Sequence, residues 1–135
     1  MPLKCFFFER IDDKGGNVAF WRRTDTGETL EHISRAPAGA MWFADWLLEL
    51  AESGNDWKGP DGHCLMVRCP NGNDWCIDSR AFNCTLPNDH IHKCWVRHGT
   101  PPSITVDKNG VTCQAGAGSI LNGTYHGFLR NGEFT

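Results

Sequence analysis

The stretch Pro37-Ala-Gly-Ala-Met-Trp-Phe-Ala-Asp-Trp-Leu-Leu-Glu-Leu-Ala-Glu52 contains the longest apolar run of the chain and decides the predicted fold. Ser34, a residue type that often caps helices, precedes it, Pro37 suits a first helical turn, and Gly54 follows as a stop signal. Its apolar residues cover more than one helical stripe, although Gly39 weakens the start. We therefore expect one amphipathic helix, over about residues 37–52, that is buried on most sides.

The remainder of the chain has the pattern of short strands joined by turns. Turn formers separate Leu3–Glu9 from Val18–Arg23, and Pro70-Asn-Gly-Asn73 separates Cys64–Arg68 from Trp75–Ser79. Asn109-Gly110 and Asn131-Gly132 favour two tight hairpins. The further predicted strands are Lys93–Arg97, Ile104–Asp107, Val111–Cys113, Tyr125–Leu129 and Glu133–Phe134. The expected fold class is α+β: a single domain, 1–135, of mainly antiparallel β hairpins with one buried helix, in which strands and helix occupy 1–62 and a Cys/His-rich β region occupies 63–135.

Size and charge exclude several classes of protein. A chain of 135 residues matches one ordinary domain, and six Trp and eight Phe supply a core. A net charge of −3 does not indicate a nucleic-acid or membrane-surface partner. No apolar run reaches the length of a membrane span, and the short apolar cluster Cys5–Phe8 is not a normal secretory signal, so we expect a protein that stays in a cytosol.

The cysteine count is the most informative feature of the composition. Seven cysteines are present, six of them after residue 62 together with five of the six histidines. Cytosolic reductants disfavour disulfides, so this excess indicates metal ligation, a reactive thiol or buried core cysteines.

The densest group of these residues predicts a structural zinc site. Thiolate and imidazole are the ligands that structural zinc takes most readily, in a tetrahedron of four. In an extended strand, His92 and Cys94 point to the same face, and a turn could fold Cys84 back toward them. Cys113 on a neighbouring hairpin would be the fourth ligand, with His90 and His126 as alternates. Because no Cys-x-x-Cys occurs, core packing of these cysteines is the competing interpretation.

Two enzymatic interpretations stay open beside the structural one. A thiolate–imidazole pair could form between Cys94 and His98, or between Cys113 and His126, although no third orienting group is evident. A small zinc hydrolase would need an open coordination position assisted by Asp78 or Asp89. The motifs of zinc deaminases and zinc proteases are both absent from the sequence.

Several segments of the second half of the chain together resemble a family of small proteins encoded by tailed bacteriophages and prophages. The resemblance covers roughly residues 60–130 and rests on Trp75–Thr85, His92–Gly99, Thr105–Gly110, Ala115–Ile120 and Tyr125–Leu129. The function of that family is unassigned. Some members carry the label "ammonia monooxygenase", which this sequence does not support, since it has no membrane span and no recognisable copper site. The resemblance implies a phage protein in the host cytoplasm or in the virion, and it transfers no catalytic residue.

These observations predict a non-enzymatic accessory protein, stabilised by zinc, that binds a host or phage protein. Exposed tryptophans, with Trp42 and Trp57 as candidates, would provide contacts. The alternatives are a virion component such as a capsid decoration protein and the small zinc hydrolase.

Overall fold

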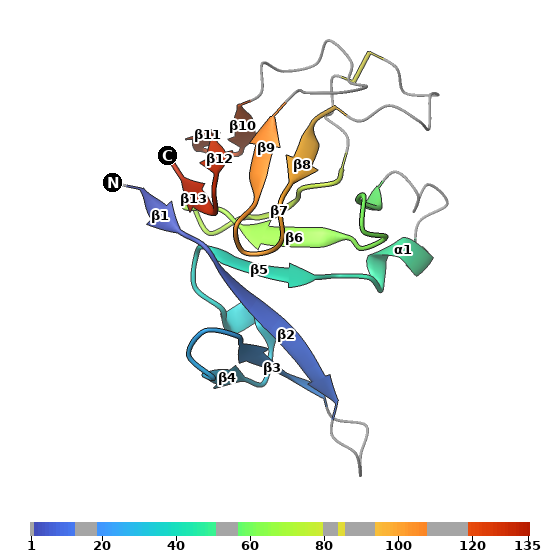
Figure 1. Cartoon of the computed structure of the whole chain (residues 1–135), viewed down its shortest axis with the longest axis vertical. Coiled ribbons are helices and arrows are strands. Elements are labelled where there is room, and N and C mark those ends of the chain that lie inside the picture. Colours follow the sequence, from blue (N-terminus) through green and yellow to red (C-terminus); the bar gives the residue numbers. More distant parts are fainter. Residues whose placement is uncertain (1, 13–18, 51–56, 80–83, 86–93, 108–118) are drawn as a thin grey trace.

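The structure, a computed structural model, describes residues 2–12, 19–50, 57–79, 84–85, 94–107 and 119–135 (Figure 1). In this part of the chain, strands dominate, and the helical elements are one 3-10 turn and one α-helix of a single turn. The elements in order are β1 (Leu3–Lys4), β2 (Phe6–Asp12), β3 (Ala19–Arg23), β4 (Thr29–Leu30), η1 (Ile33–Arg35), β5 (Ala40–Phe43), α1 (Leu47–Leu50), β6 (Leu65–Arg68), β7 (Asp74–Cys76), β8 (Val96–His98), β9 (Thr105–Asp107), β10 (Ile120–Asn122), β11 (Tyr125–Gly127), β12 (Leu129–Arg130) and β13 (Glu133–Phe134).

A six-stranded sheet in the order β4-β3-β2-β5-β6-β7 forms the frame of the molecule. β2 and β5 run parallel, and all other neighbours in this sheet are antiparallel. The long strand β2 crosses from β1 to the β3–β4 end of the sheet, whereas β5 and β6 lie across the middle (Figure 1). The predicted strands at 3–9 and 18–23 and the hairpin of 64–68 with 75–79 are thereby confirmed in outline.

The predicted helix over 37–52 is wrong, and with it the α+β fold class. Ala40–Phe43 is the central strand β5, and α1 retains only Leu47–Leu50. Gly39 adopts a φ of +98°, where a Cβ would press against the carbonyl oxygen of Lys4 at 2.9 Å, so the chain turns into a strand at this point. The described part of the chain is a β-rich fold without a long helix.

Two hydrophobic clusters on opposite faces of the sheet explain this error. Along β5, Met41 faces one cluster and Trp42 the other, and along β6 the same alternation separates Val67 from Met66. A central strand that is covered on both faces has an uninterrupted apolar sequence, as a helix buried on all sides does. Periodicity therefore could not distinguish between the two.

The C-terminal strands cover the face of the sheet that Met41 and Val67 occupy. They contribute Ile104, Val106 and Ile120, with Leu129 and Phe134, to the same cluster. β13 pairs with both β1 and β12, so the first and last strands lie side by side (Figure 1).

The predicted C-terminal hairpins are confirmed only in part. The turn at Asn131-Gly132 joins β12 to β13 as predicted, whereas β11 pairs with β10. The predicted strand 104–107 is present as β9, but it pairs with β8. The proposed hairpin partner of this strand, Val111–Cys113, lies outside the described residues. No helix in the described part is long and apolar enough to cross a membrane.

Candidate functional site

Two of the four predicted zinc ligands lie together. Cys94, two residues before β8, is buried with only 1% of its surface exposed, and the partly buried Cys84 packs against it together with Trp95. The other predicted ligands, His92 and Cys113, and the alternate His90, lie outside the described residues. Within the ranges that are described, no group of three or more His, Cys, Asp or Glu side chains is placed to hold one metal ion. The zinc site therefore stays a prediction, of which the structure describes one pair.

The alternate ligand His126 has a different neighbour. It lies on the exposed side of β11, and its Nε2 is 3.1 Å from the hydroxyl of Ser119. The structure thus gives His126 a hydrogen-bonding role at the β10–β11 hairpin.

The catalytic pair suggested for Cys94 and His98 is not formed. The imidazole Nε2 of His98 lies 3.0 Å from the carboxylate of Asp107 across the β8–β9 pair. Asp78, one of the carboxylates considered for a zinc hydrolase, is buried and bonded to Arg97. The other, Asp89, and the second thiolate–imidazole candidate, Cys113, lie outside the described residues.

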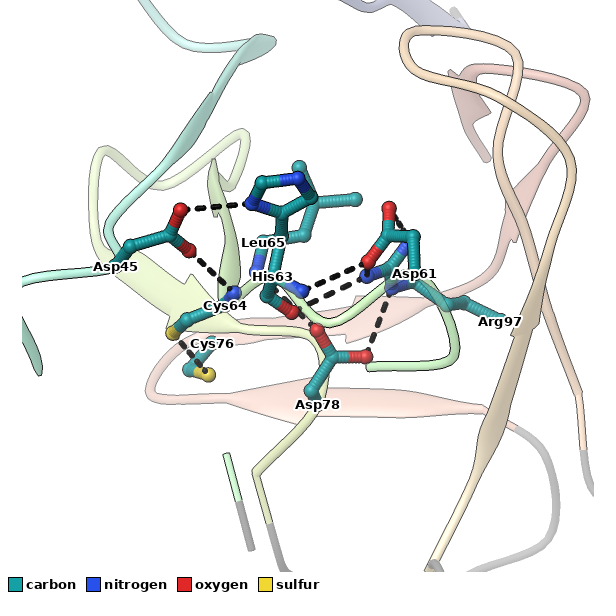
Figure 2. Close-up of polar contacts among 8 residues, drawn as sticks. All are labelled: Asp45, Asp61, His63, Cys64, Leu65, Cys76, Asp78 and Arg97. Carbon is teal, nitrogen blue, oxygen red and sulfur yellow. Dashed lines mark hydrogen bonds and ion pairs between the residues drawn. The ribbon is translucent and has the colours of Figure 1, made fainter. Parts of the chain in front are cut away.

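Three consecutive backbone amides at the start of β6 are each held by an aspartate (Figure 2). The N–H of His63 donates to Asp61 Oδ1 at 3.0 Å, that of Cys64 to Asp45 Oδ1 at 3.0 Å, and that of Leu65 to Asp78 Oδ2 at 3.1 Å. The three aspartates come from separate segments of the chain, so this arrangement ties together the segment after β5, the segment before β6 and the turn after β7. Because carboxylates accept backbone N–H bonds strongly, the segment 63–65 is fixed in position.

Arg97 on β8 compensates two of these carboxylates. Its Nε donates to Asp78 Oδ1 at 2.8 Å, and its Nη1 and Nη2 donate to Asp61 at 3.1 and 2.5 Å (Figure 2). Burial is the largest influence on Asp61 and favours its neutral form, but the hydrogen bonds from Arg97 and from the His63 amide, together with the positive charge of Arg97, outweigh burial and hold the pKa of Asp61 below its usual value. Gly59 leaves the space for the guanidinium, since a Cβ there would overlap its nitrogens.

A half-exposed histidine is oriented beside this network. His63 Nδ1 lies 2.7 Å from Asp45 Oδ2, and the imidazole stacks on the ring of Phe43 with centroids 4.1 Å apart. A carboxylate on Nδ1 fixes the orientation of the ring and leaves Nε2 as the nitrogen without this carboxylate partner. Such an imidazole is oriented to form a hydrogen bond with a ligand through Nε2.

Cys64 and Cys76 form a close thiol pair below this histidine (Figure 2). Their Sγ atoms are 3.4 Å apart, Cys64 is fully buried, and Cys76 is partly exposed. The hydrogen bond between the two thiols holds the pKa of Cys76 below its usual value, and the same bond together with burial raises the pKa of Cys64. Of the two thiols, Cys76 is the one whose thiolate form is favoured.

The remaining described cysteines on the sheet are core residues. Cys5 and Cys69 are buried in the cluster on the opposite face. Burial raises the pKa of Cys5 to about 12 and also raises that of Cys69. For these two, the core-packing interpretation of the sequence is confirmed.

Sequence reasoning overlooked both the Asp45–His63 pair and the thiol pair. The available signal was the predicted hairpin itself: in an antiparallel register that places Met66 opposite Cys76, Cys64 shares a face with Cys76. The partners of His63 and Arg97 are set by loops distant in sequence and left no local signal.

Comparison with protein-family models, with curated proteins and with solved structures finds no match to this chain.

Proposed function

We propose that this chain is a non-enzymatic accessory protein, encoded by a phage, that carries a structural zinc site and acts by binding another protein. The observation that carries the proposal is the packing of Cys84 against the buried Cys94, two predicted ligands that are ten positions apart in the sequence. The resemblance of residues 60–130 to phage and prophage proteins supports action in the cytoplasm of a bacterial host or within the virion.

Zinc would account for the position of the two thiols. The buried Cys94 and the partly buried Cys84 provide two of the thiolate ligands that structural zinc prefers. The expected sources of the other ligands are His92 and Cys113, with His90 and His126 as alternates. The strands near the pair are short, with three residues each in β8 and β9, and two-stranded ribbons of that length are weak alone. Metal binding would therefore add folding free energy where the strands contribute least.

An aromatic hollow of about 470 Å³ beside Trp46 supports the binding role. Trp46 is 39% exposed, its ring meets that of Trp21 edge to face at 6.0 Å, and Phe7 and Phe43 line the same hollow. Exposed tryptophans beside apolar pockets are frequent energetic centres of interfaces. Trp42, considered from the sequence as a contact, is buried, and Trp57 is partly buried, so Trp46 replaces them as the expected contact.

The zinc part of the proposal is tested by metal retention in matched variants. Full-length protein, Cys94→Ala and the control Cys69→Ala are equilibrated with zinc, dialysed against metal-free buffer and assayed for bound zinc. We expect wild type and Cys69→Ala to retain one zinc per chain and Cys94→Ala to lose it. Equal zinc retention by all three proteins would show that Cys94 is not a zinc ligand.

The binding part is tested by crosslinking in extracts of a bacterial host. A partner crosslinked by wild type and by Leu121→Ser, but lost with Trp46→Ser, would support the hollow as the contact surface. Leu121 is a suitable control because it is 65% exposed on a different sheet. A partner lost equally with both variants, or with neither, would contradict the assignment of Trp46.

A further inference from the structure

The thiol pair Cys64/Cys76 belongs to a different cluster from Cys84 and Cys94, the two thiol ligands of the predicted zinc site that the structure describes. We propose that Cys64 and Cys76 form a redox-active pair that reacts with small disulfides, such as oxidised glutathione, and closes reversibly to an intramolecular disulfide. The separation of the two Sγ atoms, 3.4 Å, already amounts to contact. A disulfide bond of about 2.05 Å requires the two sulfurs together to move by only about 1.4 Å.

The two thiols differ in the way that such a reaction requires. Cys76, at the end of β7, is partly exposed, whereas Cys64 is fully buried, so Cys76 is the thiol that a small disulfide from solvent would meet first. The hydrogen bond from Cys64, with the backbone amides of Asp78 and Ser79, lowers the pKa of Cys76 and so favours its thiolate. Reactive cysteines are accessible, ionise readily and often lie next to a second thiol that resolves the product.

The backbone around the pair is consistent with a labile bond. Met66 is the direct partner of Cys76 in the β6–β7 ladder, so Cys64 occupies a diagonal position on the same face. Diagonal positions lie about 7–8 Å apart at Cα, beyond the range that relaxed disulfides span, so closing the bond also requires a small shift of the β6 and β7 backbones toward each other. The Cys64–Cys76 bond is therefore expected to form under oxidising conditions and to be reduced easily.

The reaction proceeds in two balanced exchange steps. The Cys76 thiolate attacks one sulfur of the small disulfide, forming a mixed disulfide and releasing one small thiolate. The Cys64 sulfur then attacks Cys76 Sγ, which forms the intramolecular disulfide and releases the second small thiolate, while the Cys64 proton leaves with it. In total, two protein thiols are oxidised and one small disulfide is reduced to two thiols.

The other described cysteines do not offer an equivalent site. Cys5 and Cys69 lie in the opposite cluster, both are buried, and burial raises the pKa of each. Because Cys84 and Cys94 belong to a separate cluster, the redox proposal does not depend on zinc. Loss of one proposal would leave the other intact.

The test uses the reduced full-length protein, loaded with zinc, in buffers of increasing ratio of oxidised to reduced glutathione. Samples are quenched with an alkylating reagent and analysed by intact mass and peptide mapping. We expect the loss of two hydrogens in mass, a crosslink between the peptides of Cys64 and Cys76, and full reversal by dithiothreitol. Cys64→Ala should instead accumulate one glutathione on Cys76, and Cys5→Ala should behave as wild type.

Two results would overturn the proposal. One is a crosslink that joins other cysteines, or none, when the protein is folded as judged by circular dichroism. The other is a rate of Cys76 alkylation in the folded protein no higher than that of Cys5. If Cys64→Ala does not fold, the alkylation rates and the crosslink map of the wild-type protein decide the question.

Discussion

The side chains of Arg97 and Asp78 form an ion pair that is almost completely removed from solvent, with exposed fractions of 2% and 5% and an Nε–Oδ1 distance of 2.8 Å. The guanidinium also donates hydrogen bonds to Asp61, so the single cation of Arg97 on β8 pairs with two carboxylates. Through Asp78, this pair supports the amide of Leu65 at the start of β6. The same network thus positions the segment that carries His63 and Cys64.

Removing Arg97 should therefore destabilise the fold strongly. In Arg97→Met, the buried Asp78 loses its guanidinium, and breaking a buried pair in this way typically costs about 3–5 kcal/mol. The control is Arg22→Met, which removes an exposed pair with Glu9 and should cost less than about 1 kcal/mol. Urea unfolding at neutral pH measures both changes. Equal losses for the two variants would contradict the role assigned to Arg97.

Acid should weaken the same network through Asp61. Since the pKa of Asp61 is lowered in the folded state, the unfolded chain binds more protons near the usual value of 3.8. The resulting stability is present above that value and is lost as the pH falls through the lower folded pKa. We expect Asp61→Asn to show a shallower decline of unfolding free energy than wild type as the pH falls below about 4.

A salt control separates this effect from surface charge. Asp25 also has a lowered pKa because of its hydrogen bonds with Arg23, but this pair lies on the surface. High salt should suppress the contribution of Asp25 to the pH dependence of stability and should leave most of the contribution of Asp61. If high salt abolishes the difference in pH dependence between wild type and Asp61→Asn, the Arg97–Asp61 interaction behaves as an exposed ion pair, which would contradict its assignment to a partly buried network.

Gly59 should be intolerant of a side chain because of Arg97. An added Cβ would overlap the guanidinium, and overpacking of this kind costs about 1–3 kcal/mol. The penalty of Gly59→Ala should shrink when Arg97 is already replaced by Met, which a double-mutant cycle detects. If the losses of stability from Gly59→Ala and Arg97→Met simply add in the double variant, Gly59 does not act through Arg97.

The tryptophans should separate into core and surface residues. Trp42→Ala removes a side chain that is 2% exposed in the core, and we expect a loss of about 3–5 kcal/mol. Trp46→Ala removes an edge-to-face contact with Trp21 and should cost about 1 kcal/mol. Chemical denaturation compares the two variants. A large loss for Trp46→Ala would argue against its use as a free contact surface.

The strands could be predicted where one face of a segment is polar or where turn residues frame it. β2 and β3 follow from the acidic, Gly-rich sequence between them, and β6 and β7 from the turn-forming residues Pro70–Asn73. β5 could not be predicted, because burial of both faces removes the alternation that identifies a strand. The decisive residue is Gly39, which from the sequence alone is expected only to weaken a helix. In the structure, Gly39 has a positive φ, and β5 begins directly after it.

Of the candidate site, only the local enrichment in Cys and His could be predicted from the sequence. Clustering of Cys and His in the sequence indicated Cys84 and Cys94, which the fold places together. The partners of Arg97 and His63 depend on the approach of loops far apart along the chain, and no local pattern encodes such contacts. Cys64 and Cys76 could have been paired by extending the hairpin register one step beyond β6.

The central claim, that zinc stabilises this protein, is tested most directly by the metal content of protein purified without an affinity tag or chelator, with thermal melting repeated after chelation. We predict one zinc per chain and a large fall in melting temperature when the metal is removed. Protein without metal, whose melting is unchanged by the chelator and whose Cys84 and Cys94 react as thiols after unfolding, would contradict the account.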